Sequence, residues 1–171
     1  MTTNAKSSEY AYGLLNLIFQ NTIVGGSLLN VLGIRNALTP GNVYLSLHTA
    51  NPLLNPATGT QLTSEVDIIP GTTAYIGYTR VVVSLDPAAL GGPEWTVNTV
   101  LGVVTAKNAK IITFPQFGIG SAGATITHYG VGTAATSAGH LLYAAALTAP
   151  LVATVGHIPQ FAVNALTIQE A

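Results

Sequence analysis

The spacing of apolar residues along the chain changes near residue 40. Before that point, apolar residues recur at helical spacing, at Ala11, Leu14, Leu15, Ile18 and Phe19. Ser8 is the expected N-cap, and Glu9 places a carboxylate in the first turn. We therefore predict one amphipathic helix of about 12 residues. Gly25-Gly26 should end or bend it, and residues 27–33 can add a further helical turn.

From Val43 onward the apolar period is two residues. In VYLSLH (43–48) the side chains of Val, Leu and Leu share one face, while Tyr, Ser and His share the other, which is typical of a half-buried strand. Further strand candidates, separated by Gly- and Pro-rich turns, lie at 78–85, within 95–106, and at 109–114, 125–132, 140–148 and 160–168. The pattern predicts a mainly β fold, an antiparallel β-sandwich or jelly-roll-like domain preceded by an N-terminal α-helix. We expect a helical segment at 1–40, packed on or beside a β domain at 41–171.

The low charge of the chain changes this picture most. Only 6% of its 171 residues are charged and 49% are hydrophobic, whereas about 25% of an average soluble protein is charged. Either a membrane or a permanent assembly can cover so uncharged a surface. Polar residues, Gly and Pro interrupt the apolar runs at 10–34 and 111–169, so neither contains the roughly 20 apolar residues of a spanning helix. We therefore expect assembly with other proteins and no membrane.

Several binding chemistries are disfavoured by the same composition. The five Lys and Arg residues are scattered, although nucleic-acid affinity rests on clustered cations. The chain has no Cys, which excludes disulfides and thiolate ligands. The glycines of GIGSAG (118–123) match neither a dinucleotide-binding nor a Walker pattern. We expect no nucleic-acid partner and no cofactor.

Candidate catalytic and metal-binding residues are few. Ser46 and His48 share a strand face, and Asp67 or Asp86 could orient the ring, but no G-x-S-x-G elbow accompanies them. Glu65 and Asp67 form the only close acidic pair, which we interpret as a solvated strand end rather than a calcium or acid-base site. Four histidines lie on or beside four different β segments, with no metal-binding spacing, at positions His48, His128, His140 and His157. We predict no catalytic, cofactor-binding or metal residues.

Assembly contacts are the remaining site to predict. The helix carries apolar residues beyond one stripe, because Tyr12 and Leu17 lie off the row of Leu14 and Ile18. One face can pack on the β domain while the other meets a neighbour, although simple burial is an equal alternative. Trp95 is expected in a core or interface, with an exposed binding aromatic as the alternative. The predicted assembly contacts are Tyr12, Leu14, Leu17, Ile18 and Trp95.

The order of several motifs resembles a family of small tailed-bacteriophage virion proteins, commonly labelled tail fibre or minor tail proteins, some of them head-decorating. These motifs are VYLSLHTANP, SEV followed by YTRVVV, KIITFP, TITHYGVGTAATSAGHLLYAAALTAP and a closing ALTI, within residues 10–168. The resemblance implies a β-rich domain with an N-terminal helix, no catalytic residues and a location in the virion. Two segments depart from the family pattern. The segment after Asp86 (87–106) is longer and more apolar, and the turn VGTAATSAGH (131–140) lacks an acidic residue near its start.

Two hypotheses about function follow. The first is a non-enzymatic structural protein of a tailed bacteriophage virion, attached to the capsid surface as a decoration or cement protein, or to the tail as a minor tail or fibre protein. Its partners would be other virion proteins and further copies of itself in a symmetric homo-oligomer such as a trimer. The alternative is a β-sandwich glycan-binding module for host attachment, with Trp95 and the loop 51–64 as its contact surface. The sequence leaves head and tail locations open.

Overall fold

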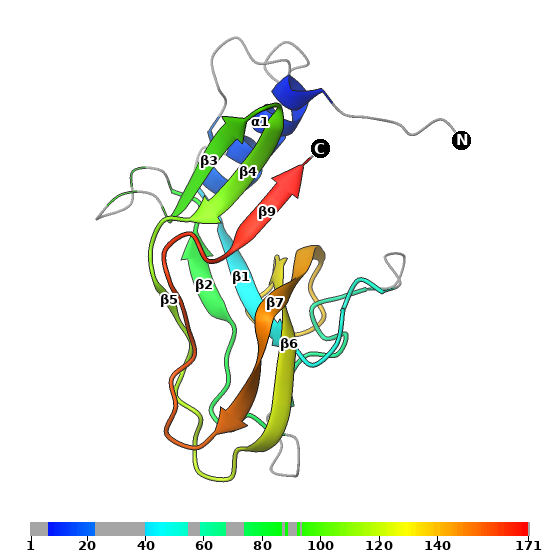
Figure 1. The fold of residues 1–171 in the computed structure, drawn as a ribbon, viewed down its shortest axis with the longest axis vertical. Coiled ribbons are helices and arrows are strands. Elements are labelled where there is room, and N and C mark those ends of the chain that lie inside the picture. The colour runs from blue at the N-terminus through cyan, green and yellow to red at the C-terminus, as the bar shows by residue number, and fades with distance from the viewer. Residues whose placement is uncertain are drawn as a thin grey trace. The chain divides into compact units, whose positions relative to one another are not determined.

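The computed structural model describes residues 7–22, 40–54, 59–67, 74–86, 88, 92 and 94–170. The elements along this part of the chain are α1 (Ser8–Gln20), β1 (Asn42–His48), β2 (Val81–Ser84), β3 (Trp95–Val100), β4 (Val103–Asn108), β5 (Ile112–Thr113), β6 (Ala122–Gly132), β7 (Leu141–Thr154), β8 (Gln160–Phe161) and β9 (Thr167–Glu170) (Figure 1). The prediction of a mainly β, antiparallel fold with an N-terminal helix is confirmed. No described helix is long and apolar enough to cross a membrane.

The chain divides into two compact units. The first contains α1, β3, β4 and β9, and the second contains β5, β6 and β7 with nearly all of β1 and β2. The predicted boundary at residue 40 stays a prediction, because residues 23–39 lie outside the described part of the chain. The helical turn predicted at 27–33 lies outside it as well.

In the first unit, α1 begins one residue earlier than predicted. Ser7, and not Ser8, is the N-cap, and its Oγ accepts a hydrogen bond of 3.2 Å from the Tyr10 amide. Glu9 lies in the first turn, where its carboxylate complements the helix dipole. Asn21 ends the helix at φ 46°, a left-handed conformation that Asn adopts more readily than most residues. Local side-chain chemistry therefore accounts for both ends.

The helix covers a three-stranded antiparallel sheet of order β3-β4-β9 in the same unit. Figure 1 shows α1 behind β3 and β4, and the buried face of the helix presents Ala11, Leu15 and Phe19. Phe19 packs against Trp95 with ring centroids 4.6 Å apart. The sheet adds the buried residues Val97, Val104, Ala106 and Ile168. The apolar stripe of the helix and the apolar face of the sheet thus pack together in one small core.

Two predicted strands prove to be pairs of strands. The run 95–106 is a hairpin, in which Leu101 and Gly102 connect β3 to β4 with φ angles of 52° and 82°. The run 160–168 contains β8 and the start of β9, separated by a bend with Asn164 at φ 63°. In both runs apolar residues continue up to and beyond the turn, so the hydrophobic pattern alone conceals it.

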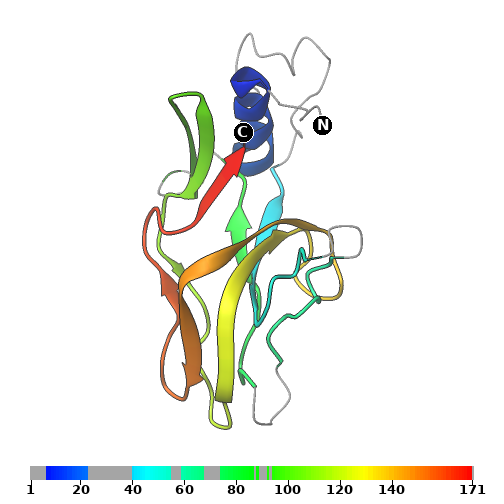
Figure 2. The same ribbon diagram turned by 45° about the vertical axis from the view of Figure 1, so that its right-hand side comes forward.

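The second unit is built on a four-stranded sheet of order β2-β1-β6-β7. β1 and β6 pair in antiparallel register from Tyr44 opposite Gly132 to His48 opposite His128. β7 pairs antiparallel with β6, and the register shifts at three places along the pair, which mark bulges or irregularities. Figure 2 shows β6 and β7 side by side. Both faces of β1 are buried from Leu45 to His48, so this strand runs through the middle of the unit.

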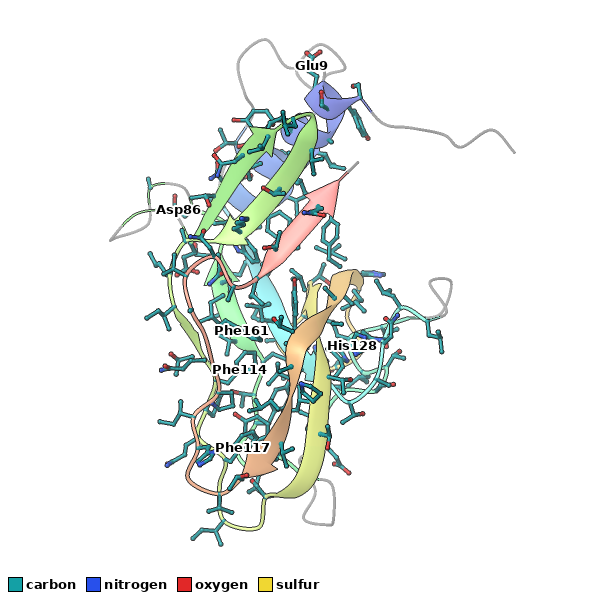
Figure 3. The ribbon with its side chains drawn as sticks, in the orientation of Figure 1. Glu9, Asp86, Phe114, Phe117, His128 and Phe161 are labelled. Carbon is teal, nitrogen blue, oxygen red and sulfur yellow. The ribbon has the colours of Figure 1, made fainter. Side chains whose placement is uncertain are left out.

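An aromatic cluster fills part of the core of the second unit. Tyr75 lies 4.0 Å from Phe117 and 5.3 Å from Tyr78, measured between ring centroids, and Tyr78 stacks with Phe114 at 6.3 Å. Figure 3 labels Phe114 and Phe117 on the segment that follows β5. The Tyr78 hydroxyl accepts a 3.0 Å hydrogen bond from the Leu47 amide, which ties the cluster to β1. Burial raises the pKa of both tyrosines, so they stay protonated.

Candidate functional site

A groove of about 560 Å³ opens on the second unit. Its walls come from residues 62–67, residues 78–80 and the turn 135–137, and they include Leu62, Glu65, Asp67 and Arg80. The Leu62 side chain is 54% exposed and gives the groove an apolar lip. A volume of this size lies within the range of about 300–1,000 Å³ that binding pockets occupy.

Glu65 and Arg80 form a largely buried ion pair in the wall of this groove. Arg80 donates two hydrogen bonds of 2.7 Å, one to each carboxylate oxygen of Glu65, and the Tyr78 hydroxyl donates a third at 2.8 Å. The side chains of Arg80 and Glu65 are only 3% and 10% exposed. The hydrogen bond to Glu65 raises the pKa of Arg80. This paired carboxylate therefore does not resemble a free general base.

The arginine also fixes the turn on the opposite wall. Its Nη1 and Nη2 donate 2.8 Å hydrogen bonds to the carbonyl oxygens of Ala134 and Ser137. Gln61 is completely buried beneath the same turn, where its Oε1 accepts a 2.9 Å bond from the Ala134 amide. Gly132 and Gly139 leave the space that Gln61 fills. The shape of the groove is therefore maintained by Arg80 and Gln61, which are themselves fixed by hydrogen bonds and burial.

The interpretation of Glu65 and Asp67 as a solvated strand end is wrong for Glu65, whose side chain is only 10% exposed and is paired with Arg80. Asp67 is exposed, and both residues line a second hollow of about 390 Å³ beside Thr49 and Gly123. Among the residues that the structure describes, no three His, Asp or Glu side chains gather as metal ligands would. The two carboxylates have different environments, because Glu65 pairs with Arg80 while Asp67 lies at an exposed position.

Ser46 and His48 do meet, as their shared strand face predicts. The Ser46 Oγ and His48 Nε2 are 2.8 Å apart, and His48 Nδ1 lies 2.9 Å from the carbonyl oxygen of Thr63. Because a carbonyl only accepts, Nδ1 carries the proton and Ser46 donates to Nε2. Both side chains are completely buried, and burial lowers the pKa of His48. The ring fastens the 60–65 loop to β1, and a carbonyl stands where a triad would need a carboxylate.

The other histidines lie in different environments. His128 faces His48 across β1 and β6, and its Nδ1 is 2.8 Å from the Thr127 hydroxyl (Figure 3). His140 and His157 are exposed. The four residues therefore form no common site in the described chain.

The predicted assembly residues fall into two groups in the first unit. Tyr12, Leu14, Leu17 and Ile18 are half-buried on α1 and keep some surface available to a partner. Trp95 is completely buried against Phe19, so a partner reaches it only after this unit rearranges. A buried Trp95 also has no free face on which a sugar could stack. The role of these five residues in assembly stays a prediction.

The two most exposed large apolar side chains in the described part of the first unit were not among the predicted contacts. They are Leu101 and Val100, which lie at the end of the β3–β4 hairpin and are 99% and 66% exposed, beside Val103 at 39%. The dipeptide Leu-Gly inside an apolar run was the available signal, because Gly at the second position is typical of two-residue hairpin turns. Its first residue, Leu, is not typical of such turns, and this concealed the tip.

Residues 20–169 match the family model described as podophage GP4 fiber I protein gp80. No curated protein matches the chain significantly. The family match spans most of the 171 residues, and the chain therefore belongs to this family of podophage fibre proteins. The predicted resemblance to tailed-phage virion proteins is confirmed, and so is the predicted location in the virion.

Proposed function

We propose that this member of the podophage fibre family is a non-enzymatic structural subunit attached to the tail rather than the capsid surface. It acts through contacts with other virion proteins and with further copies of itself, in a symmetric homo-oligomer such as a trimer. The observation that carries the proposal is the family match over residues 20–169, which describes a fibre protein.

The chemistry of the surface supports an assembly role. Residues 111–169 contain no Asp, Glu, Lys or Arg, and they supply β5, β6, β7 and β8. A free monomer normally relies on surface charge for solubility, whereas a virion subunit is covered by neighbours at high local concentration. The half-buried residues of α1, Tyr12, Leu14, Leu17 and Ile18, are proposed as one of these contacts.

The non-enzymatic part of the proposal rests on the condition of the candidate groups. Ser46 and His48 are completely buried, and Glu65 is neutralised by Arg80. Ser46 is hydrogen-bonded to His48, His48 to the carbonyl oxygen of Thr63, and Glu65 to Tyr78 and Arg80. A nucleophile or a general base must be accessible to the substrate and must have a reactive atom that is not already paired. None of these three side chains meets both conditions.

Copy number per particle distinguishes the two locations. We would measure it by quantitative mass spectrometry of purified virions, with the major capsid protein as the internal standard. A tail-borne fibre subunit is expected at a few to a few dozen copies per particle. A ratio near one per capsid protein, or a simple fraction such as one third, would instead indicate a capsid decoration protein and overturn the tail assignment.

A further inference from the structure

The end of the β3–β4 hairpin is an unusual surface feature. The hairpin tip, Val100–Val103, carries a Leu101 side chain that is 99% exposed, beside Val100 at 66%. The last three residues of β3 are exposed on both faces of the hairpin. The tip therefore extends beyond the part of the hairpin that α1 covers.

The backbone of the tip is unfavourable for the residue that occupies it. Leu101 has φ 52° and Gly102 has φ 82°, as the two central residues of a type I′ turn require. Asn, Asp or Gly is the usual first residue of this turn, and a bulky apolar residue is disfavoured there. Folding alone gives no reason for a fully exposed Leu in a left-handed conformation, and such outliers cluster at sites of function.

We propose that the hairpin tip of one copy inserts into the groove of a second copy. The groove, bounded by residues 62–67, 78–80 and 135–137, is concave and about 560 Å³ in volume, with the half-exposed Leu62 at its lip. The hairpin tip is convex and carries no charge. Because Glu65 and Arg80 already neutralise each other, an apolar insert does not bury an unpaired charge at that pair. Asp67 also lines the groove and is exposed, so the insert must leave this carboxylate in contact with water.

Because the hairpin tip is small, contact with a recess is favoured over contact with the same tip of another copy. A stable interface buries roughly 800 Å² on each partner, and three exposed side chains meeting their own copies would bury far less. A recess surrounds an inserted side chain on several sides and permits contacts at its rim. A contact between two different surfaces of the same chain is heterologous, so it closes into a ring or propagates as a filament. This inference rests on the proposed self-assembly in the virion.

The absence of cysteine from the chain makes the contact directly testable. A Leu101→Cys protein and a Thr136→Cys protein are purified separately, mixed and oxidised, and the products are identified by mass spectrometry. We expect a disulfide between positions 101 and 136 of different copies. Leu101→Cys mixed with Val152→Cys is the matched control, since Val152 is 53% exposed on β7 and is not part of the groove. That mixture should give no comparable product.

Sedimentation or native mass spectrometry of the cysteine-free chain provides the second measurement. Leu101→Asn removes the apolar side chain but suits the turn, so it should preserve folding and weaken self-association about tenfold or more. A dominant 101–101 disulfide would overturn the proposal in favour of tip-to-tip contact. Unchanged association of Leu101→Asn, or a wild-type chain that stays monomeric at every concentration, would also overturn it. A virion copy number typical of a tail protein would leave the proposed function intact in each of these cases.

Discussion

Replacing Arg80 by methionine tests the network that shapes the groove. Methionine keeps most of the aliphatic stem and removes the guanidinium group, which makes two 2.7 Å bonds to Glu65. It also removes the 2.8 Å bonds to the carbonyl oxygens of Ala134 and Ser137. The Glu65 side chain, 10% exposed, is then left as a nearly buried carboxylate without its counter-charge.

The expected cost follows from this geometry. Removing one partner of a buried ion pair costs about 3–5 kcal/mol of unfolding free energy. Glu65 keeps the 2.8 Å bond from the Tyr78 hydroxyl and some access to solvent, so we expect about 3 kcal/mol, the lower end of that range. The double variant Glu65→Gln with Arg80→Met removes both charges together. It should cost only about 1–2 kcal/mol, because no buried charge is left unpaired.

Urea unfolding of purified protein measures both values. The near-UV circular dichroism of the tyrosines follows mainly the second unit, which contains Arg80, Tyr75 and Tyr78. Trp95 is the single tryptophan and lies in the first unit, so its fluorescence follows the unfolding of that unit separately. The reasoning is refuted if Arg80→Met costs less than about 1 kcal/mol, as exposed ion pairs do, or if the double variant is the less stable of the two.

Three further substitutions probe other contacts. Because burial lowers the pKa of His48 below its ordinary 6.5, the unfolded state takes up the proton first; the unfolding free energy should therefore fall as the pH drops below about 6.5. Urea titrations at pH 7.5 and 5.5 measure this fall, which should shrink in His48→Gln. Gly132→Ala should cost about 1–3 kcal/mol because its Cβ overlaps Gln61, whereas the control Gly41→Ala meets no atom within 4 Å; scanning calorimetry compares them. Asn108→Ala removes an amide that donates to two carbonyls and accepts from the Leu166 amide, and should lower first-unit stability by about 2 kcal/mol in tryptophan-monitored unfolding. The role of His48 is contradicted if His48→Gln and the wild type show the same pH dependence. The packing of Gly132 against Gln61 is contradicted if both glycine variants lose equal stability, and the role of Asn108 if Asn108→Ala leaves the unfolding transition unchanged.

The parts of the fold that depend on local pattern could be predicted from the sequence. The α1 stripe from Ala11 to Phe19 and the alternation of VYLSLH each carry their own period, and both elements are present. Their environments depend on residues far along the chain and could not be predicted. His48 is buried because the loop at Thr63 covers it, and Glu65 finds its counter-charge 15 residues away in Arg80. Such pairings are set by how loops fold over the sheet, which no short window of sequence reports.

The hairpin tip and the groove differ in how far tertiary contacts support their local backbone conformation, and this difference bears on assembly. In the groove, Arg80 and Gln61 hold the turn 134–139 in place by hydrogen bonds. The local conformation of this turn is therefore stabilised by its tertiary contacts. The hairpin tip lacks such support. Leu101 adopts a left-handed conformation that costs about 1–2 kcal/mol, and its side chain, which is 99% exposed, gains no packing energy that would offset this cost. Sequences normally break local rules where function requires it. A rigid recess and a stiff two-stranded hairpin both lose little conformational freedom on contact, so the exposed leucine can contribute most of its apolar surface to association.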